Sequence, residues 1–154
     1  MSTTAVVADD QPAYAAFISY ATPDKAKADE ICESLERRGF RCWIAPRDVR
    51  AGHPYPNEII RGIELSRCLI LVLSEAANQS VFVAREVERA VSHRKAVFPV
   101  RIEEVMPSRG LELLVSTVHW IDAWTGSMGA HMERLARDLQ DDDVLEKVAQ
   151  FSQK

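Results

Sequence analysis

The sequence predicts one α/β domain built as a doubly wound parallel sheet, and three observations lead to this prediction. Strand-like and helix-like segments alternate from Tyr14 onward. Two of the strand-like segments, 14–20 and 68–74, are continuous apolar runs, as expected of strands covered on both faces. The 154 residues are enough for one domain with a proper core.

The first half of the chain is expected to hold three strands and two helices. A helix begins at Thr22-Pro23, where a capping hydroxyl precedes a proline at the first helical position, and it ends at Gly39. A charged loop, 46–54, follows the second strand. The expected strands are Tyr14–Tyr20, Phe40–Ala45 and Cys68–Ser74, and the second helix is Pro56–Ser66, which buries Ile59, Ile60 and Ile63.

The second half is expected to add two strands and three helices. A helix starting near Ser80 has apolar residues at helical spacing and buries Val83, Val87, Ala90 and Val91. The remaining elements are a strand Ala96–Ile102, a short helix within Pro107–Val115, a strand Thr117–Ile121 and a helix Ser127–Gln140.

Five strands joined by helices imply right-handed crossovers, and the strand order expected is 2-1-3-4-5, the flavodoxin-like arrangement. In that order the chain reverses direction between strands one and three, so a ligand should bind beyond the carboxyl ends of these strands. The residues expected there are Ser19–Pro23, the loop after strand two, and the region between Ser74 and the next helix.

The two ends of the chain lie outside the alternating pattern. Residues 1–13 read as a flexible leader without the basic start and apolar run of a signal peptide. In residues 141–154 an apolar stripe follows three aspartates, and it predicts either a final helix docked on this domain or a linker helix for another chain or domain. No apolar run approaches the roughly 20 residues of a membrane helix, so we expect a cytoplasmic protein that does not contact membranes.

Several classes of function are disfavoured by composition and missing motifs. The net charge is −4, which leaves no cationic excess for a nucleic-acid partner. The chain has neither GxGxxG nor GxxxxGK[ST], which disfavours dehydrogenases and NTPases. The three cysteines form no CxxC pair and read as buried thiols in a reducing compartment; they are Cys32, Cys42 and Cys68. The four histidines lack the spacing of metal ligands, so no metal site is expected.

Three segments fall at the predicted crevice. They are Phe17-Ile18-Ser19-Tyr20, then Cys42–Asp48 with Ala51-Gly52, and finally Leu71–Ser74 with Ser80, Phe82, Glu86 and Ala90. In this order and spacing they resemble a Toll/interleukin receptor (TIR) domain of the bacterial type, over about 14–140. The family implies the same sheet order. Its members are either scaffolds of signalling complexes or enzymes that cleave NAD⁺ with a glutamate. In the enzymes this glutamate lies six residues after a serine and four after an aromatic residue, and Glu86 has this spacing from Ser80 and Phe82.

Glu86 also stands out without the family. It lies three residues after Val83 and four before Ala90, along the apolar side of its helix, where a carboxylate is costly to bury without a partner. One interpretation is an ion pair with Arg85 or Arg89, and the other is catalysis. A single carboxylate suits NAD⁺ cleavage, because nicotinamide leaves as a neutral molecule and only the positive charge on the ribose needs stabilising.

The resemblance also implies a substrate site and an assembly loop. For substrate binding it points to Tyr20, Ala21, Thr22, Trp43, Arg50 and Phe82, with Arg47 and Arg50 as candidates for the pyrophosphate. Family members can carry a basic residue where Ala21 and Thr22 stand, and most often a tryptophan at Phe82. The assembly loop includes Arg47, Asp48, Ala51 and Gly52, and it implies head-to-tail assembly, which builds filaments rather than closed dimers.

Two functions remain as hypotheses. The first is an NAD⁺ glycohydrolase with catalytic Glu86, for which NAD⁺ is the substrate and no cofactor is needed, acting in bacterial antiphage defence or virulence and activated by self-assembly. The alternative is a non-catalytic adaptor that binds other TIR domains through the loop around Asp48–Gly52.

Overall fold

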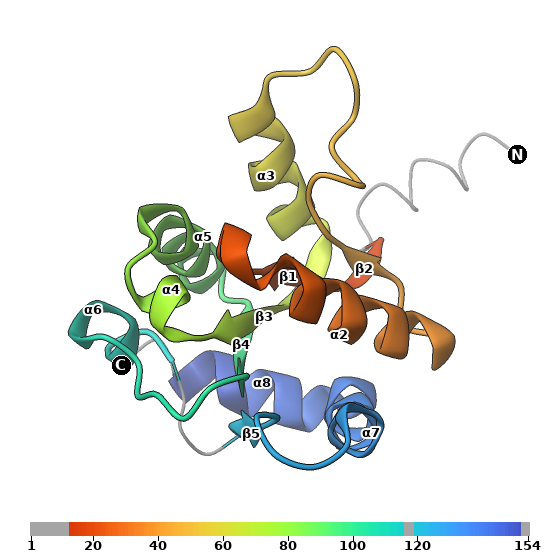
Figure 1. The fold of residues 1–154 in the computed structure, drawn as a ribbon. Coiled ribbons are helices and arrows are strands. Elements are labelled where there is room, and N and C mark those ends of the chain that lie inside the picture. Colours follow the sequence, from red (N-terminus) through yellow and green to blue (C-terminus); the bar gives the residue numbers. More distant parts are fainter. Residues whose placement is uncertain (1–12, 116–118, 152–154) are drawn as a thin grey trace, which may run out of the picture.

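The computed structural model describes residues 13–115 and 119–151, and it contains a five-stranded parallel sheet in the order β2-β1-β3-β4-β5 (Figure 1). This is the predicted flavodoxin-like order. The strands are β1 (Tyr14–Ser19), β2 (Cys42–Trp43), β3 (Ser66–Leu73), β4 (Ala96–Arg101) and β5 (Ile121–Asp122). The helices are η1 (Thr22–Asp24), α2 (Lys25–Arg37), α3 (Tyr55–Glu64), α4 (Glu75–Asn78), α5 (Val81–Ser92), α6 (Arg109–Glu112), α7 (Met128–Gln140) and α8 (Asp142–Phe151).

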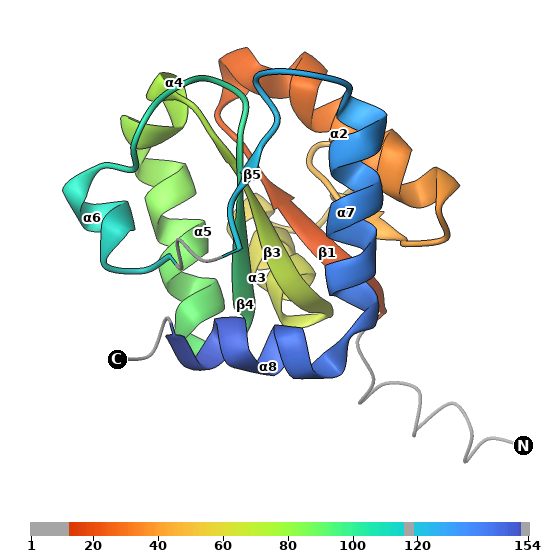
Figure 2. The same ribbon diagram turned by 90° about the horizontal axis from the view of Figure 1, so that it is seen from below.

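Helices cover both faces of the sheet, and each face has its own hydrophobic core (Figure 2). Successive strand residues point to opposite faces, so neighbours in β1 contribute to different cores. Ile18 packs with residues of α2, α7 and α8, whereas Phe17 packs with residues of α3, α5 and α6. In β3, Ile70 pairs with Ile18 and lies in the same core, and Leu69 pairs with Phe17 and lies in the other core. The central strands are therefore mainly apolar, because both of their faces are covered.

Several expected boundaries are wrong. Strand β3 spans Ser66–Leu73 rather than 68–74. The helix predicted for 56–66 ends at Glu64, because Ser66 already pairs with Tyr14 as the first residue of β3. The second strand has two residues rather than six. At its start Phe40 N still bonds to Leu35 O of α2, and at its end Ile44 N turns to the Asp48 carboxylate instead of a neighbouring strand.

The start of the first helix also differs from the prediction. Thr22 does not cap it: residues 22–24 form a short 3-10 turn after Ala21, and α2 begins at Lys25. Ser80, by contrast, caps α5 by accepting a hydrogen bond from Val83 N, as its place before the apolar stripe suggested. Of the expected fifth strand, residues 117 and 118 lie outside the described residues, and the described strand is 121–122.

Helix α8 docks on the domain itself and lies beneath the sheet in Figure 2. Val148 is buried in the same core as Met132 and Leu135 of α7, and Val144 and Leu145 pack against that core. Asp142, at the start of α8, forms an ion pair with Arg67 of β3. The apolar stripe of the tail is thus turned toward this domain. Within the described residues, no helix is long and apolar enough to cross a membrane.

Candidate functional site

A cavity of about 550 Å³ opens between α3 and α5, above the carboxyl end of β1. This is the crevice expected where the chain reverses direction between β1 and β3. Strand β1 and its loop contribute Phe17, Ile18, Tyr20, Ala21 and Thr22; α3 and the preceding segment contribute Ala45, Tyr55, Pro56, Ile59, Ile60 and Ile63; and α5 with its cap contributes Ser80, Phe82, Arg85, Glu86 and Arg89. The walls are mainly apolar, with a few polar groups on the α5 side, as in typical small-molecule sites.

The carboxylate of Glu86 lines this cavity and accepts a hydrogen bond from the end of β1. The Ser19 hydroxyl donates a hydrogen bond of 2.7 Å to Glu86 Oε1. Burial raises the pKa of Glu86 from 4.5 to about 7, and the hydrogen bond from Ser19 opposes that rise. Near neutral pH the group therefore exchanges between its acid and carboxylate forms.

The ion pair considered for Glu86 is not formed. Among the described residues, neither Arg85 nor Arg89 lies within ion-pairing distance of an acidic group, although both line the same cavity as Glu86. A partly buried carboxylate with one hydroxyl donor and no cation is unusual for a purely structural group. A carboxyl group with a shifted pKa that faces a cavity is a candidate for a functional site.

Helical periodicity explains why α5 presents these residues. Val83, Val87 and Ala90 are buried against the sheet. At about 100° per residue, Glu86 lies at the edge of that apolar stripe, and the cavity-lining residues continue round the helix away from it. Glu86 is thus the deepest charged group of the α5 wall, and the arginines lie nearer to solvent.

Phe82 stands at the mouth of the cavity. Its side chain is 74% exposed, and Tyr55 across the opening is 53% exposed. Core packing, the alternative role of Phe82, is therefore excluded. An exposed aromatic ring at the edge of a cavity is available to stack on a planar ligand.

The first-strand loop lies where the sequence predicts it. Tyr20, Ala21 and Thr22 all line the cavity, and the Tyr20 hydroxyl donates a 2.7 Å hydrogen bond to the carbonyl of Ala45. This bond ties the loop after β1 to the end of the β2 segment. Five of the seven residues predicted for catalysis or substrate binding, namely Glu86, Tyr20, Ala21, Thr22 and Phe82, are therefore brought together in one place.

Trp43 and Arg50 do not line the cavity, and the expectation of direct contact is corrected for both. Trp43 is fully buried and stacks on Phe17, with ring centroids 4.9 Å apart. It supports the cavity floor from behind, since Phe17 is the residue that faces the cavity. Arg50 instead pairs with the buried carboxylate of Glu58, at 2.8 Å between Nη2 and Oε2.

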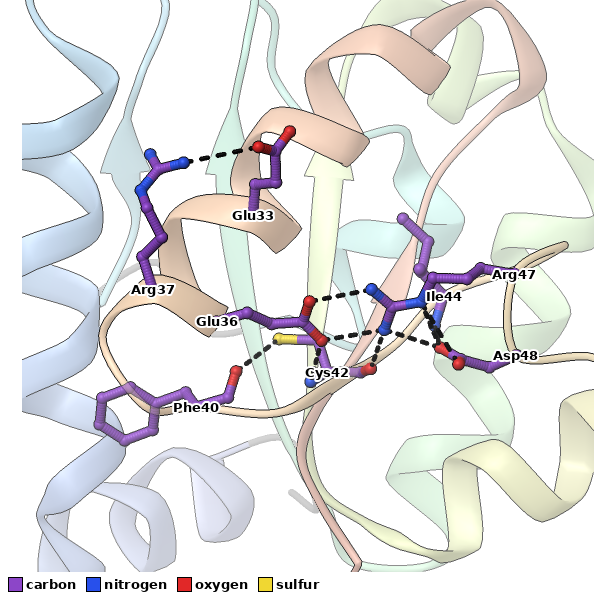
Figure 3. A network of polar contacts seen from close by, with 8 residues as sticks. All are labelled: Glu33, Glu36, Arg37, Phe40, Cys42, Ile44, Arg47 and Asp48. Atoms are coloured by element: carbon purple, nitrogen blue, oxygen red, sulfur yellow. Dashed lines mark hydrogen bonds and ion pairs between the residues drawn. The ribbon is translucent and has the colours of Figure 1, made fainter.

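The expected assembly loop is held by carboxylates (Figure 3). Arg47 reaches Glu36 of α2 through two hydrogen bonds of 2.9 Å, and Asp48 accepts a 2.9 Å hydrogen bond from Ile44 N. Arg47 holds the pKa of Glu36 below its usual range, chiefly by hydrogen bonding. Ala51 and Gly52 are exposed, and Gly52 has a φ of +81°, which favours glycine. Arg47 is engaged within its own chain and does not line the cavity.

Sequence reasoning missed the role of α3 and of the two arginines. Tyr55 and Ile60 form the wall opposite Glu86, and the sequence had suggested only that Ile60 would be buried. Arg85 and Arg89 were considered only as ion-pair partners. The helical positions of Phe82, Glu86 and Arg89, which fall on one side of α5, were a signal that could have revealed Arg89 as a cavity residue.

Comparisons with known proteins agree with this architecture. A family model described as the TIR domain matches residues 16–139. A stimulator of interferon genes protein from Magallana gigas is 40% identical over 85 residues, which are 53% of this chain and 20% of that protein. The chain thus spans about a fifth of that relative's length.

Solved structures show the same fold. The TIR domain of the Toll-related receptor TRR-2 from Hydra magnipapillata has a TM-score of 0.71 at 22% identity, covering 83% of this chain and 99% of that one. A metazoan TIR-STING receptor from C. gigas has a TM-score of 0.65 at 26% identity, covering 84% of this chain and 41% of that one. These relatives are animal proteins, so they do not confirm the bacterial type suggested by the sequence.

Proposed function

The chain belongs to the TIR domain family, and we propose that it is an NAD⁺ glycohydrolase that releases nicotinamide and leaves ADP-ribose or a cyclic isomer of it. The observation that carries this proposal is Glu86: a partly buried carboxylate that lines a ligand-sized cavity, accepts a hydrogen bond from Ser19 and has no cationic partner among the described residues. The family match alone would fit a scaffold equally well. The isolated carboxylate favours the enzyme.

The reaction needs little from the protein besides this carboxylate. The bond between nicotinamide nitrogen and ribose breaks, its electron pair goes to the nitrogen, and the pyridinium becomes neutral nicotinamide. Positive charge develops on the ribose, and the Glu86 carboxylate beside it stabilises that charge. Water then adds to the ribose carbon and loses a proton to solvent, or a group of the same molecule adds to give the cyclic product.

The cavity suits one end of a dinucleotide. Its volume of about 550 Å³ falls within the usual range for small-molecule sites. The exposed ring of Phe82 offers a surface for the flat nicotinamide. The positive charge of bound nicotinamide favours the carboxylate form of Glu86, and thus lowers a pKa that burial has raised to about 7. Substrate binding itself thereby produces the active ionisation state.

Assembly with other copies of the domain would activate the site. The loop 47–55 leads directly into α3, the cavity wall opposite Glu86, so a contact made by this loop acts on the site. A heterologous contact through the loop would build strings of domains. The setting that we propose, bacterial defence or virulence, rests on the order and spacing of the three sequence motifs alone.

The test is nicotinamide release from NAD⁺ by dilute, concentrated and artificially clustered protein. We expect release that grows faster than linearly with protein concentration. Glu86→Gln should lower the rate by about 100-fold or more, because it removes the charge without changing the shape. Equal release by wild type and Glu86→Gln would show that the catalytic assignment is wrong.

A non-catalytic adaptor is the second candidate, and the loop 47–55 favours it. The Arg47–Glu36 and Arg50–Glu58 pairs hold this loop, and its tip at 51–53 is exposed, which suits a surface that recognises another domain. This function predicts concentration-dependent association without loss of NAD⁺, weakened by substitution at Asp48 or Gly52. A protein that stays monomeric at high concentration would contradict it.

A further inference from the structure

We propose that Arg89, flanked by Arg85, binds the diphosphate of the dinucleotide, while Phe82 holds the nicotinamide on the other side of Glu86. This inference rests on the proposed cleavage of NAD⁺ and adds to it a binding role for residues outside the motif. It makes the site specific for nucleotides over nucleosides, which lack phosphate.

Charge distribution around the cavity leads to Arg89. The charged residues that line it are Arg85, Glu86 and Arg89. In the described part of the chain, neither guanidinium group has an acidic partner, and among the arginines without one, Arg85 and Arg89 are the two that line the cavity. Cations left unpaired beside a largely apolar cavity are available to an anionic ligand.

The arginines suggested for the pyrophosphate by the sequence are not available. Arg47 is held by Glu36 and Asp48, and Arg50 by Glu58. The loop after β1, where the family can carry a basic residue, has Ala21 and Thr22 on the cavity wall. The opposite wall, α5, therefore supplies the positive charge that the substrate needs.

The order of residues along α5 matches the order of groups in NAD⁺. Phe82 and Arg89 are seven residues apart, so they lie within about 20° of each other around the helix, at opposite ends of two turns. Glu86 lies between them, about 6 Å along the axis from Phe82 and about 4.5 Å from Arg89. A dinucleotide lying along the helix thus places nicotinamide at Phe82, the scissile bond at Glu86 and the diphosphate at Arg89.

The chemistry of the groups is complementary. A diphosphate carries two negative charges near neutral pH, and a guanidinium group can donate two parallel hydrogen bonds to phosphate oxygens. Arg85, one turn before Arg89 on α5, adds a second cation at the rim. The positive nicotinamide meets Glu86, and the negative diphosphate meets the arginines, so binding in the reverse direction is opposed at both ends.

The test compares Arg89→Gln, Arg89→Lys and wild type on NAD⁺ and on nicotinamide riboside, which lacks phosphate. Arg89→Gln should lower kcat/KM for NAD⁺ by about 10- to 100-fold and leave that for nicotinamide riboside unchanged within about twofold. Arg89→Lys keeps the charge but loses the paired hydrogen bonds, so its kcat/KM for NAD⁺ should lie between those of wild type and Arg89→Gln. Arg109→Gln is the matched control, because Arg109 is exposed on α6, outside the cavity, and has no ion pair among the described residues.

Binding of ADP-ribose, measured by titration calorimetry, separates this inference from the proposed reaction. Its dissociation constant should rise about tenfold or more in Arg89→Gln and stay unchanged in Arg109→Gln. If wild type releases no nicotinamide while ADP-ribose binds more weakly to Arg89→Gln than to Arg109→Gln, that result would refute the proposed reaction and support the diphosphate site. Equal dissociation constants in both variants, no binding to wild type, or equal losses on both substrates would overturn the inference.

Discussion

The hydroxyl of Ser19 lies 2.7 Å from Oε1 of Glu86 and donates a hydrogen bond to it across 67 residues of sequence. The bond joins the carboxyl end of β1 to the middle of α5. Ser19 is fully buried, so the donor to the carboxylate is fixed by the surrounding core. Burial of Glu86 favours its neutral acid form, whereas Ser19 favours the ion, and the pKa of about 7 is the balance of the two.

The first prediction concerns pH. If the carboxylate form of Glu86 is the active one, kcat/KM for nicotinamide release should rise tenfold per pH unit below about 7 and level off above it, since this parameter reports the free enzyme. The measurement is the initial rate at low NAD⁺ between pH 5 and pH 9. A rate that is flat across pH 6–8, or that falls with rising pH, would contradict a role for ionised Glu86.

The second prediction concerns the donor to Glu86. Ser19→Ala removes a hydrogen bond that stabilises the ion, so the inflection of the pH profile should move upward by about one unit. Ser66→Ala is the matched control: Ser66 is another buried β-strand serine, but its hydroxyl donates to the carbonyl of Gly62. The control should lower stability without moving the inflection. An unmoved inflection in Ser19→Ala would show that the bond has no effect on ionisation.

The third prediction uses stability rather than activity. Between pH 4.5 and about 7 the native protein keeps a proton on Glu86 that an ordinary glutamate would release, so the free energy of unfolding falls as pH rises through this window. Glu86→Gln cannot ionise and avoids this loss. We expect it to be more stable than wild type by about 1–3 kcal/mol at pH 8, and nearly equal at pH 4. Urea unfolding at the two pH values measures this, and a variant less stable than wild type at pH 8 would count against it.

The fourth prediction separates the ring of Phe82 from the fold. Because this side chain is 74% exposed, Phe82→Ala should change the free energy of unfolding by less than about 0.5 kcal/mol. It should lower kcat/KM for NAD⁺ by about tenfold through the loss of stacking, and Phe82→Trp should keep the activity. Thermal unfolding and nicotinamide release are measured on the same preparations. Full activity in Phe82→Ala would exclude the ring from the site.

The fifth prediction concerns the wall formed by α3. A Cβ on Gly62 would lie 2.6 Å from two ring atoms of Trp43, which is itself fully buried and stacked on Phe17. Gly62→Ala should therefore destabilise the protein by about 1–3 kcal/mol, despite the better helix propensity of alanine. In Gly129→Ala, on α7, the nearest atom is Ser127 Oγ at 3.5 Å, so this control should be neutral or slightly stabilising. Equal stability of the two variants, by urea unfolding, would show that the contact with Trp43 can relax.

Much of the frame could be predicted from local patterns. Apolar runs identified β1 and β3, and helical spacing identified α2, α5 and α7. Alternating strands and helices imply a doubly wound parallel sheet, and in the expected order 2-1-3-4-5 the chain reverses direction between strands one and three, so the place of the cavity was predictable as well. Glu86 was singled out by its spacing after Ser80 and Phe82, which resembles the family pattern, and by its place beside an apolar stripe at the predicted crevice.

The partners of each charged and aromatic side chain could not be predicted in the same way. Arg50 and Trp43 looked like ligand-binding residues, yet Arg50 pairs with Glu58 and Trp43 packs behind Phe17, while Arg89 is left for a ligand. Periodicity determines which face of an element a residue occupies, because it depends only on the backbone repeat. The choice among competing partners depends on distances between elements that are far apart in the sequence, and only the packed tertiary structure sets those distances.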